Sequence, residues 1–331
     1  MSKKTLNVEL PTLLDNRPLT IRHETVRAIF NIYSTVVGAY SEALKDLDCK
    51  EIKTPGILGV ASEGGANFFT IDYFDKKAFL AQSPQFYKQI CVGAFERVFE
   101  VGPVFRAERS FTTRHVNEYV SLDAEFAFIK DHNDLLEFLT KTLRHIFSEI
   151  NSKNKDDLKL YNVEPINVPD EIPQIKLSEM KKIIKEKYGY DVPKDTDIDP
   201  QGEVYAGQYA REEFDSDFIA LTHYPKSQRP FYTMPDDENK EETKSFDLIF
   251  KGVEIATSSQ RIHDYDKLVA SIKDFGLEPK DYEFYLNAFK YAMPPHGGWG
   301  MGSERIVFKL LSLGSVKEAI LFPRDVKRLE P

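Results

Sequence analysis

The stretch Phe105-Arg106-Ala107-Glu108, followed after a polar loop by Tyr119-Val120-Ser121-Leu122-Asp123-Ala124-Glu125-Phe126, decides the fold of this chain. Polar and apolar residues alternate, which predicts two adjacent strands, because successive side chains of a strand point to opposite faces. One face then carries an arginine and several carboxylates, a floor suited to an anionic, metal-bearing ligand. The simpler alternative is a sheet with one solvated face. The polar residues of this face are Arg106, Glu108, Tyr119, Ser121, Asp123 and Glu125.

The composition is that of an ordinary soluble globular protein, with 331 residues, 41% of them hydrophobic and 29% charged. This length suits one large domain with an insertion. The net charge of −9 argues against general nucleic-acid binding, so any nucleic acid would need a local basic surface. The two cysteines, Cys49 and Cys91, give no disulfide framework. Without a secretory signal or an apolar run of membrane-spanning length, we expect a cytoplasmic protein that makes no membrane contact.

Helical spacing of apolar residues predicts a long amphipathic helix from Arg22 to about Leu47 and another over residues 133–152. Ser83-Pro84 predicts the start of a further helix, because proline is favoured in a first helical turn. Three polar residues of that helix, Gln85, Lys88 and Gln89, would share one face. A short strand is expected at Glu51–Pro55.

Residues 154–242 differ in composition from the rest of the chain. They are rich in lysine and proline, and their apolar residues show only weak helical spacing. We interpret them as an inserted subdomain with short strands at Phe218–Leu221 and Phe231–Met234. The predicted organisation is an N-terminal arm over residues 1–20 and one domain over residues 21–331. The expected fold class is α+β, an antiparallel sheet flanked by helices.

Residues 246–256 predict a hairpin that turns at Lys251-Gly252. In this register Ile249 lies opposite Glu254 and Asp247 lies opposite Ala256, so the two acids share a face. Two neighbouring carboxylates repel unless one is protonated or a cation lies between them, and Mg²⁺ is the usual cation beside phosphates. Arg261 would reach this face only through a bulge within residues 257–260. An exposed hairpin with incidental acids is the alternative.

Residues 296–305 read His-Gly-Gly-Trp-Gly-Met-Gly-Ser-Glu-Arg and precede an apolar helix. Glycines let the backbone approach a flat or phosphorylated ligand, and a helix N-terminus adds partial positive charge. Arg305 in the first turn could bind a phosphate as a planar fork. A tight turn without a ligand is the alternative.

Together these segments resemble the catalytic domain of class II aminoacyl-tRNA synthetases, and of these the aspartyl enzymes of the archaeal and eukaryotic type. The resemblance runs from about residue 14 to residue 325. It implies a homodimer whose interface is built by the helix and strand that end at Pro55. The substrates it implies are ATP with Mg²⁺, L-aspartate and the acceptor end of tRNA. In the mechanism that it implies, the aspartate carboxylate attacks the ATP α-phosphorus, and tRNA then takes the aspartyl group from the adenylate.

The resemblance also implies roles for individual residues. Arg106 and Arg305 match the arginines that hold the triphosphate, so they would be the catalytic residues. Lys88 and Arg261 match the cations that clamp the aspartate side chain, and two cations would select an anion over the neutral amide of asparagine. The further ATP contacts are Glu108, His115, Tyr119 and Glu254; the further aspartate contacts are Glu63, Gln85 and Asp123; and the Mg²⁺ ligands are Asp247 and Glu254.

Two departures from the family pattern leave alternatives open. Arg109-Ser110-Phe111 stands where the aspartyl enzymes usually have Glu-His-Asn, and no anticodon-binding domain precedes residue 14. The first hypothesis is a ligase that charges tRNA with aspartate. The second is a paralog that makes the same adenylate and passes it to ammonia, giving asparagine. The third is a binding or regulatory protein without catalysis.

Overall fold

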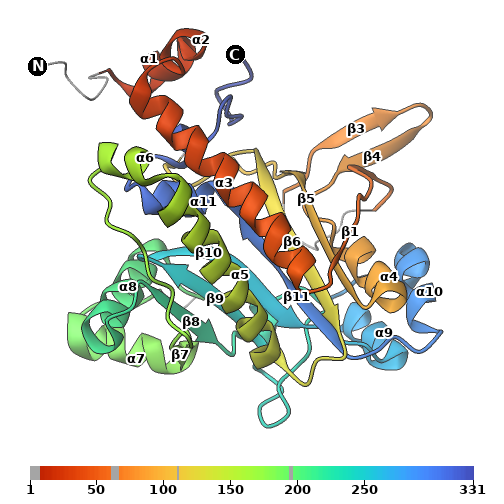
Figure 1. Ribbon diagram of the computed structural model, residues 1–331. Coiled ribbons are helices and arrows are strands. Elements are labelled where there is room, and N and C mark those ends of the chain that lie inside the picture. The colour runs from red at the N-terminus through yellow and green to blue at the C-terminus, as the bar shows by residue number, and fades with distance from the viewer. Residues whose placement is uncertain (1–7, 61–66, 110–111, 194–196) are drawn as a thin grey trace, which may run out of the picture.

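The computed structural model describes residues 8–60, 67–109, 112–193 and 197–331. Its centre is an eight-stranded sheet in the order β1-β5-β6-β11-β10-β9-β8-β7 (Figure 1). From β5 to β8 in this order, each strand runs antiparallel to its neighbour. The outer pairs of the sheet, β1–β5 and β7–β8, are parallel. A small second sheet, β2-β4-β3, projects from the body. The strands are β1 (Lys50–Glu51), β2 (Ile57–Leu58), β3 (Thr70–Tyr73), β4 (Lys76–Leu80), β5 (Arg97–Phe105), β6 (Glu118–Ala127), β7 (Gln174–Lys176), β8 (Phe218–Thr222), β9 (Ser245–Phe250), β10 (Val253–Gln260) and β11 (His296–Gly302).

Two long helices, α3 and α5, lie across one face of the sheet (Figure 1). Between them and the sheet lies the main core, to which all three contribute buried side chains such as Tyr40, Leu143 and Trp299. The expected α+β architecture is therefore confirmed. The helices are α1 (Leu10–Asp15), α2 (Arg17–Thr20), α3 (Glu24–Asp46), α4 (Gln85–Phe95), α5 (His132–Lys153), α6 (Lys155–Leu160), α7 (Leu177–Tyr188), α8 (Pro200–Phe214), α9 (Tyr265–Asp274), α10 (Glu283–Phe289) and α11 (Ser303–Leu310), with 3-10 turns η1 (Lys226–Gln228), η2 (Pro279–Tyr282) and η3 (Val316–Ala319).

The three helices predicted from the sequence each begin next to a residue that suits a helix start. The side chain of Asp131 accepts a hydrogen bond from the backbone N–H of Asn133 at the start of α5. His23 does the same for α3, and Pro84 precedes the first residue of α4. These three predicted helices are confirmed. In the core that α3 covers, the indole of the buried Trp299 donates to the Tyr40 hydroxyl across 3.2 Å.

The first strand of the opening motif was predicted in the wrong place. Strand β5 ends at Phe105, so Arg106 and Glu108 follow the strand. The chain leaves the sheet here because the Asn117 side chain donates to the carbonyls of Arg106 and Glu108, across 2.7 and 3.0 Å, and ties the loop to itself. The second strand is confirmed as β6, whose residues Leu122, Ala124 and Phe126 lie in the core.

The hairpin turns at Lys251-Gly252 as predicted, and Ile249 lies opposite Glu254. Asp247, however, lies opposite Thr257, because the register shifts between Glu254 and Ala256. The predicted bulge therefore exists earlier in the strand than expected. Its extra residue turns Thr257, and with it Arg261, to the face of Glu254.

The weakly patterned segment adds strands to the main sheet, since β8 pairs with β9 and β7 pairs with β8. Helices α7 and α8 pack on these strands around a separate apolar cluster that includes Met180, Ala206 and Leu221.

The prediction of a strand at Phe231–Met234 was wrong, because this stretch forms only an isolated bridge through Thr233. Of the strand expected at Glu51–Pro55 only Glu51 is in a strand, because β1 is Lys50–Glu51. The proposed domain limits stay a prediction.

Arg17, in the described part of the N-terminal arm, lies against the C-terminal segment. The buried guanidinium of Arg17 donates to the carbonyls of Glu318, Ile320 and Leu321 across 2.6 to 3.1 Å. No helix of the described ranges combines the length and the apolarity needed to cross a membrane.

Candidate functional site

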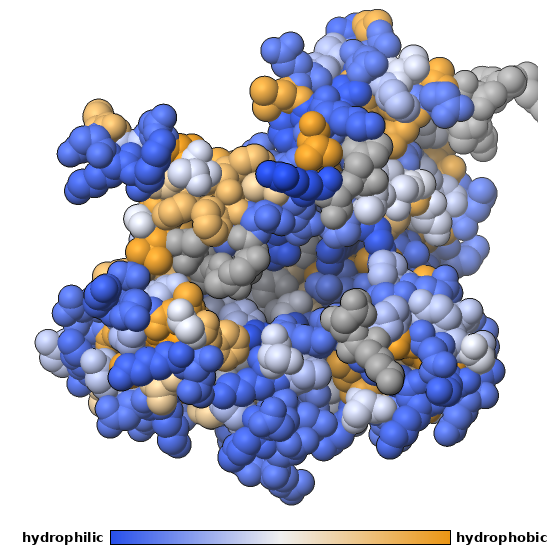
Figure 2. Space-filling view, turned by 180° about the vertical axis from the view of Figure 1, so that it is seen from behind, coloured by the Kyte–Doolittle hydropathy of each residue, from blue (hydrophilic) through white to orange (hydrophobic). Residues whose placement is uncertain are grey.

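The face of the sheet opposite α3 and α5 is hollowed and largely hydrophilic (Figure 2). A cavity of about 320 Å³ lies there, a size found for small-molecule sites. Strands β6, β10 and β11, the loop after β5 and the start of α11 supply its walls. Nine of the residues predicted from the sequence line it: Gln85, Arg106, Glu108, His115, Tyr119, Asp123, Glu254, Arg261 and Arg305.

Two predicted residues do not line the cavity, and a third lies outside the described residues. Lys88 and Asp247 are buried behind the pocket wall and do not line the cavity. Glu63 lies outside the described residues, as do Ser110 and Phe111 of the departing loop.

One end of the site is a buried network of paired charges around Glu125. Arg261 Nε donates to one carboxylate oxygen of Glu125 across 3.0 Å, and Lys88 Nζ lies 3.5 Å from the other. Burial alone would raise the pKa of Glu125, but these two cations together hold it below its ordinary value. Lys88 also donates to Asp123 across 2.9 Å and to the Trp299 carbonyl across 2.8 Å. Two cations and two carboxylates therefore neutralise one another at this end.

Arg261 is the cation of this network that reaches the cavity. Its Nη2 donates to the Gly298 carbonyl across 3.0 Å and to the amide oxygen of Gln85 across 3.3 Å. These contacts fix the plane of the guanidinium, which lies 5.4 Å from the centre of the Tyr232 ring. A planar guanidinium held in this way binds a carboxylate in a defined orientation.

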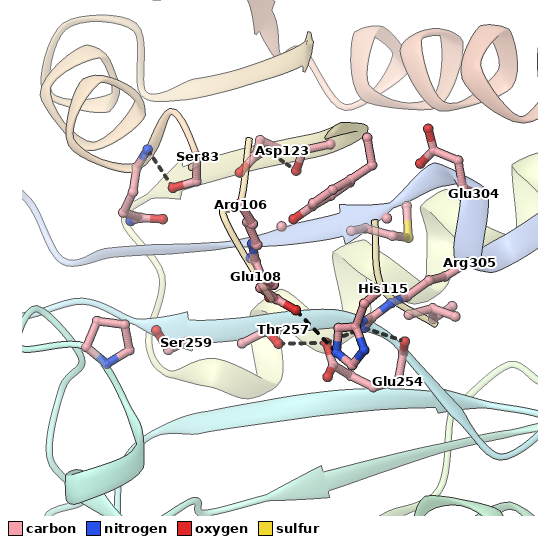
Figure 3. A pocket seen from close by; sticks show the side chains of 18 of the residues that line it. Ser83, Arg106, Glu108, His115, Asp123, Glu254, Thr257, Ser259, Glu304 and Arg305 are labelled. Carbon is pink, nitrogen blue, oxygen red and sulfur yellow. Dashed lines mark hydrogen bonds and ion pairs between the residues drawn. The ribbon is translucent and has the colours of Figure 1, made fainter. Parts of the chain in front are cut away.

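The other end of the site is rich in arginines (Figure 3). Arg305 lies 3.1 Å from Glu254 Oε1, and Thr257 donates to the same oxygen across 3.3 Å. Burial raises the pKa of the Glu254 carboxyl, but Arg305, Arg229 and Arg106 outweigh this and leave it lowered. Besides Arg261, four arginines line the cavity, and such a group of guanidinium donors suits a polyanion such as a triphosphate.

His115 and Glu108 come together in the loop after β5. Their side chains are 3.4 Å apart, at the rim of the arginine-rich end. Burial lowers the pKa of His115, and the nearby arginines add to this against the opposing effect of Glu108. The imidazole is therefore neutral near pH 7 and available for hydrogen bonding. Arg106 stacks over the Tyr119 ring at 5.6 Å, so an aromatic face and a cation lie together.

The predicted metal pair is divided between two arginines. Asp247 lies 2.8 Å from Arg229 and Glu254 lies 3.1 Å from Arg305. Burial, reinforced by Glu254, raises the pKa of Asp247 to about 6 despite Arg229. Among the described residues no group of three or more His, Cys, Asp or Glu side chains could hold a metal ion. Glu254 has the right chemistry and position for a cation shared with phosphates, whereas Arg229 occupies the place beside Asp247.

Sequence reasoning missed several residues that shape the pocket. Arg229 and Arg114 line the cavity, and Glu203 lies behind it and binds Arg114. Arg229 stacks over Tyr224 at 3.7 Å and is 8% exposed. Its segment had no strand or helix periodicity, so no local signal identified it. Glu125 was placed on the correct face but not recognised as the centre of the charge network.

Comparisons with known proteins agree with this geometry. A profile of the family "tRNA synthetases class II (D, K and N)" matches residues 9–326. The aspartate–tRNA(Asp/Asn) ligase of Thermus thermophilus is 44% identical over 320 residues, which cover 97% of this chain and 75% of that protein. The aspartate–tRNA(Asp) ligase of Pyrococcus horikoshii is 42% identical over 328 residues, covering 98% and 74%.

Two solved structures are similar over almost the whole chain. The asparaginyl-tRNA synthetase of Pyrococcus horikoshii complexed with asparaginyl-adenylate has a TM-score of 0.92 at 33% identity, covering 98% of this chain and 74% of that one. The aspartyl-tRNA synthetase of Entamoeba histolytica has a TM-score of 0.87 at 33% identity, covering 100% and 65%.

Proposed function

Because the chain belongs to the family of class II tRNA synthetases for D, K and N and is an aspartyl-tRNA synthetase-like catalytic domain, we propose that it activates L-aspartate with ATP. The product would be aspartyl-adenylate, from which the aspartyl group passes to the 3′ end of tRNA. The observation that carries this proposal is the two-ended cavity. Arg261 lines one end and the arginines around Glu254 line the other.

In this reaction an oxygen of the aspartate α-carboxylate bonds to the α-phosphorus, and the bond to the leaving pyrophosphate breaks. The charges to be neutralised are all negative, and Arg106 and Arg305, which line the cavity, would do this without a general base. Mg²⁺ held by Glu254, with Asp247 nearby, would neutralise phosphate charge when bound. Arg261 would receive the side-chain carboxylate of aspartate.

Selectivity for aspartate follows from charge. Glu125 already partners Arg261 and Lys88, so both cations are held in place before substrate binds. A ligand carboxylate would bind a guanidinium that is fixed by Gln85 and the Gly298 carbonyl. The side-chain amide of asparagine would instead point N–H donors at the guanidinium, which itself has only donors. These donors cannot pair with one another, which costs binding energy.

The test is aspartate-dependent exchange of pyrophosphate into ATP with Mg²⁺, run without tRNA and beside asparagine. We expect exchange with aspartate and none with asparagine. An R261Q variant should lose the exchange, while R211Q, at an exposed arginine of α8, should keep it. Absence of exchange with either amino acid in the unaltered protein would contradict the proposed activation and favour a binding protein.

The acceptor is tested separately by offering the active protein tRNA or ammonia. Aspartate that becomes acid-precipitable with tRNA would support the ligase, and free asparagine formed from ammonia would support the amide-forming alternative. The proposed homodimer is tested by light scattering, where a mass near 38.1 kDa would contradict it.

A further inference from the structure

Helix α8 carries a carboxylate to the back of the arginine-rich wall. Glu203 is in the first turn of α8, and its side chain is only 11% exposed. Arg114 donates to both of its oxygens, across 3.3 Å from Nη1 and 2.9 Å from Nη2. The backbone N–H of Glu254 donates to Glu203 Oε2 across 2.7 Å. One buried carboxylate thus joins the loop after β5 to the β9–β10 hairpin.

The contact to Glu254 supplies a partner that the sheet does not. Strand β11 pairs with Ala256–Gln260 of β10 and stops short of Glu254. The Glu254 N–H would therefore be left without a strand partner on that side, and Glu203 accepts its hydrogen bond. Besides its contact with Glu203, Arg114 Nη2 donates to the Gly252 carbonyl across 3.2 Å. The arginine is therefore held both at the hairpin turn and at helix α8.

Helix α8 is docked on this turn with no free space. A Cβ added to Gly207 would lie 2.4 Å from the Gly252 nitrogen, closer than any real Cβ contact. Gly252 itself has φ +76 and would bring a Cβ to 3.0 Å from the Val204 backbone. The position of Glu203 is therefore set by backbone packing and does not depend on its own side-chain contacts.

We propose that Glu203 is a positioning residue for ATP, acting through Arg114 and the Glu254 backbone. It touches no part of the cavity itself, since Arg114 and Glu254 line the wall and Glu203 lies behind them. Its role is to orient the guanidinium of Arg114 and the hairpin that carries Glu254 before nucleotide binds. This inference rests on the proposed function, because the ligand of that wall is taken to be the triphosphate.

The test is an E203Q variant, which keeps the shape of the side chain but removes one acceptor and the charge. Losing one charge-assisted contact predicts a rise of roughly 5- to 30-fold in KM for ATP, with KM for aspartate changed by less than about 2-fold. The matched control is E212Q, at an exposed glutamate of the same helix. It should leave both constants and the melting temperature unchanged.

A double-mutant cycle with R114Q separates positioning from a general structural role. Because Glu203 acts in part through Arg114, the rise in KM for ATP in the E203Q/R114Q double variant should be clearly smaller than the product of the two single rises. Additive effects, or equal rises in both KM values together with a lower melting temperature, would overturn the inference. Binding of an ATP analogue with a methylene bridge between the α- and β-phosphorus, measured by calorimetry, gives a readout independent of amino-acid activation. If the unaltered protein binds the analogue but shows no exchange, the proposed function fails, and a weaker analogue affinity in E203Q would still support the positioning role.

Discussion

Glu125 illustrates how this chain keeps ionised groups in a dry site. It has no solvent exposure, yet two cations from different elements, Lys88 on α4 and Arg261 after β10, approach its two oxygens. Each cation then has a further acceptor, so none of the charges depends on one partner. Removal of Lys88 would leave two buried carboxylates with one cation, Arg261, which costs more than the pair contributes.

At this scale we expect K88M to destabilise the fold strongly. Asp123 and Glu125 would keep their burial but lose their shared ammonium group, and breaking a buried pair costs about 3–5 kcal/mol. The free energy of unfolding in urea measures this loss. Aspartate activation should fall as well, while binding of an ATP analogue persists in the folded fraction.

The matched control is K141M, which removes an exposed lysine paired with Glu137 one helical turn away. Exposed pairs of this kind contribute about 0.3–0.5 kcal/mol. Equal stability of K88M and K141M would show that the buried network is dispensable and that Lys88 has another purpose.

At the scale of elements, the docking of α8 on the hairpin predicts a large difference between two glycine substitutions. G207A should force α8 away from Gly252, since the new methyl group would overlap the backbone. We expect a loss of more than about 2 kcal/mol, together with a raised KM for ATP. G38A, in helix α3 with open space around it, should instead stabilise by about 0.5–1 kcal/mol.

Urea unfolding of both variants measures the changes in stability. ATP–pyrophosphate exchange measures the KM for ATP of G207A. If G207A unfolds like the unaltered protein, helix α8 has freedom that the short distances do not indicate. Unchanged KM for ATP in a destabilised G207A would separate the stability of the helix from the positioning of Glu203.

Helices and strands with a regular repeat of polar and apolar residues were predictable from the sequence. The ends of strands and the position of the bulge were not. The long helices follow from side-chain spacing because one face of each is buried, and β6 follows from the strict alternation of polar and apolar residues along it. Strand β5 was misplaced because polar alternation continues into Arg106 and Glu108 after the strand ends, whereas Gly102-Pro103 interrupts the pattern within it. The bulge at Glu254 was required by the face of Arg261, but its position depends on pairing with β9.

The pocket residues divide in the same way. Those within motifs, such as Arg106 and Arg305, were identified from their neighbours in sequence. The Arg114–Glu203 pair joins residues 89 positions apart, and nothing local distinguishes Glu203 from other glutamates. Such pairs depend on how α8 packs on the sheet, which periodicity does not specify.

At the scale of the whole molecule, two buried histidines predict a loss of stability in acid. Burial lowers the pKa of His132 to about 4, with a smaller effect from His223, and burial lowers that of His296 to about 4. Above pH 6.5, the ordinary pKa, both are neutral whether folded or unfolded, so their contribution is fully present. Between pH 6.5 and 4 the unfolded chain binds protons that the folded chain does not. Each histidine then costs up to about 3 kcal/mol.

The measurement is the free energy of unfolding at pH 7.5 and pH 5.0 for the unaltered protein, H132Q and H296Q. Each variant should lose less stability between the two pH values than the unaltered protein. Comparing variants with the unaltered protein is necessary because buried carboxyl groups with raised pKa values act in the opposite direction: Glu203, Asp247 and Glu304. H145Q, at a partly exposed histidine, is the control. An identical pH dependence in all four proteins would contradict the assignment.

The place of β11 in the sheet has a consequence for synthesis on the ribosome. This strand, His296–Gly302, lies between β6 and β10 and is the last one made. Until it emerges, the nascent chain holds two half-sheets with open inner edges, and the residues that meet in the pocket belong to separate halves. At roughly 5–20 residues per second, this state would last for several seconds after β10 has been translated. Open edges invite pairing with other chains, so ribosome pausing before residue 296 should favour aggregation and early chaperone binding.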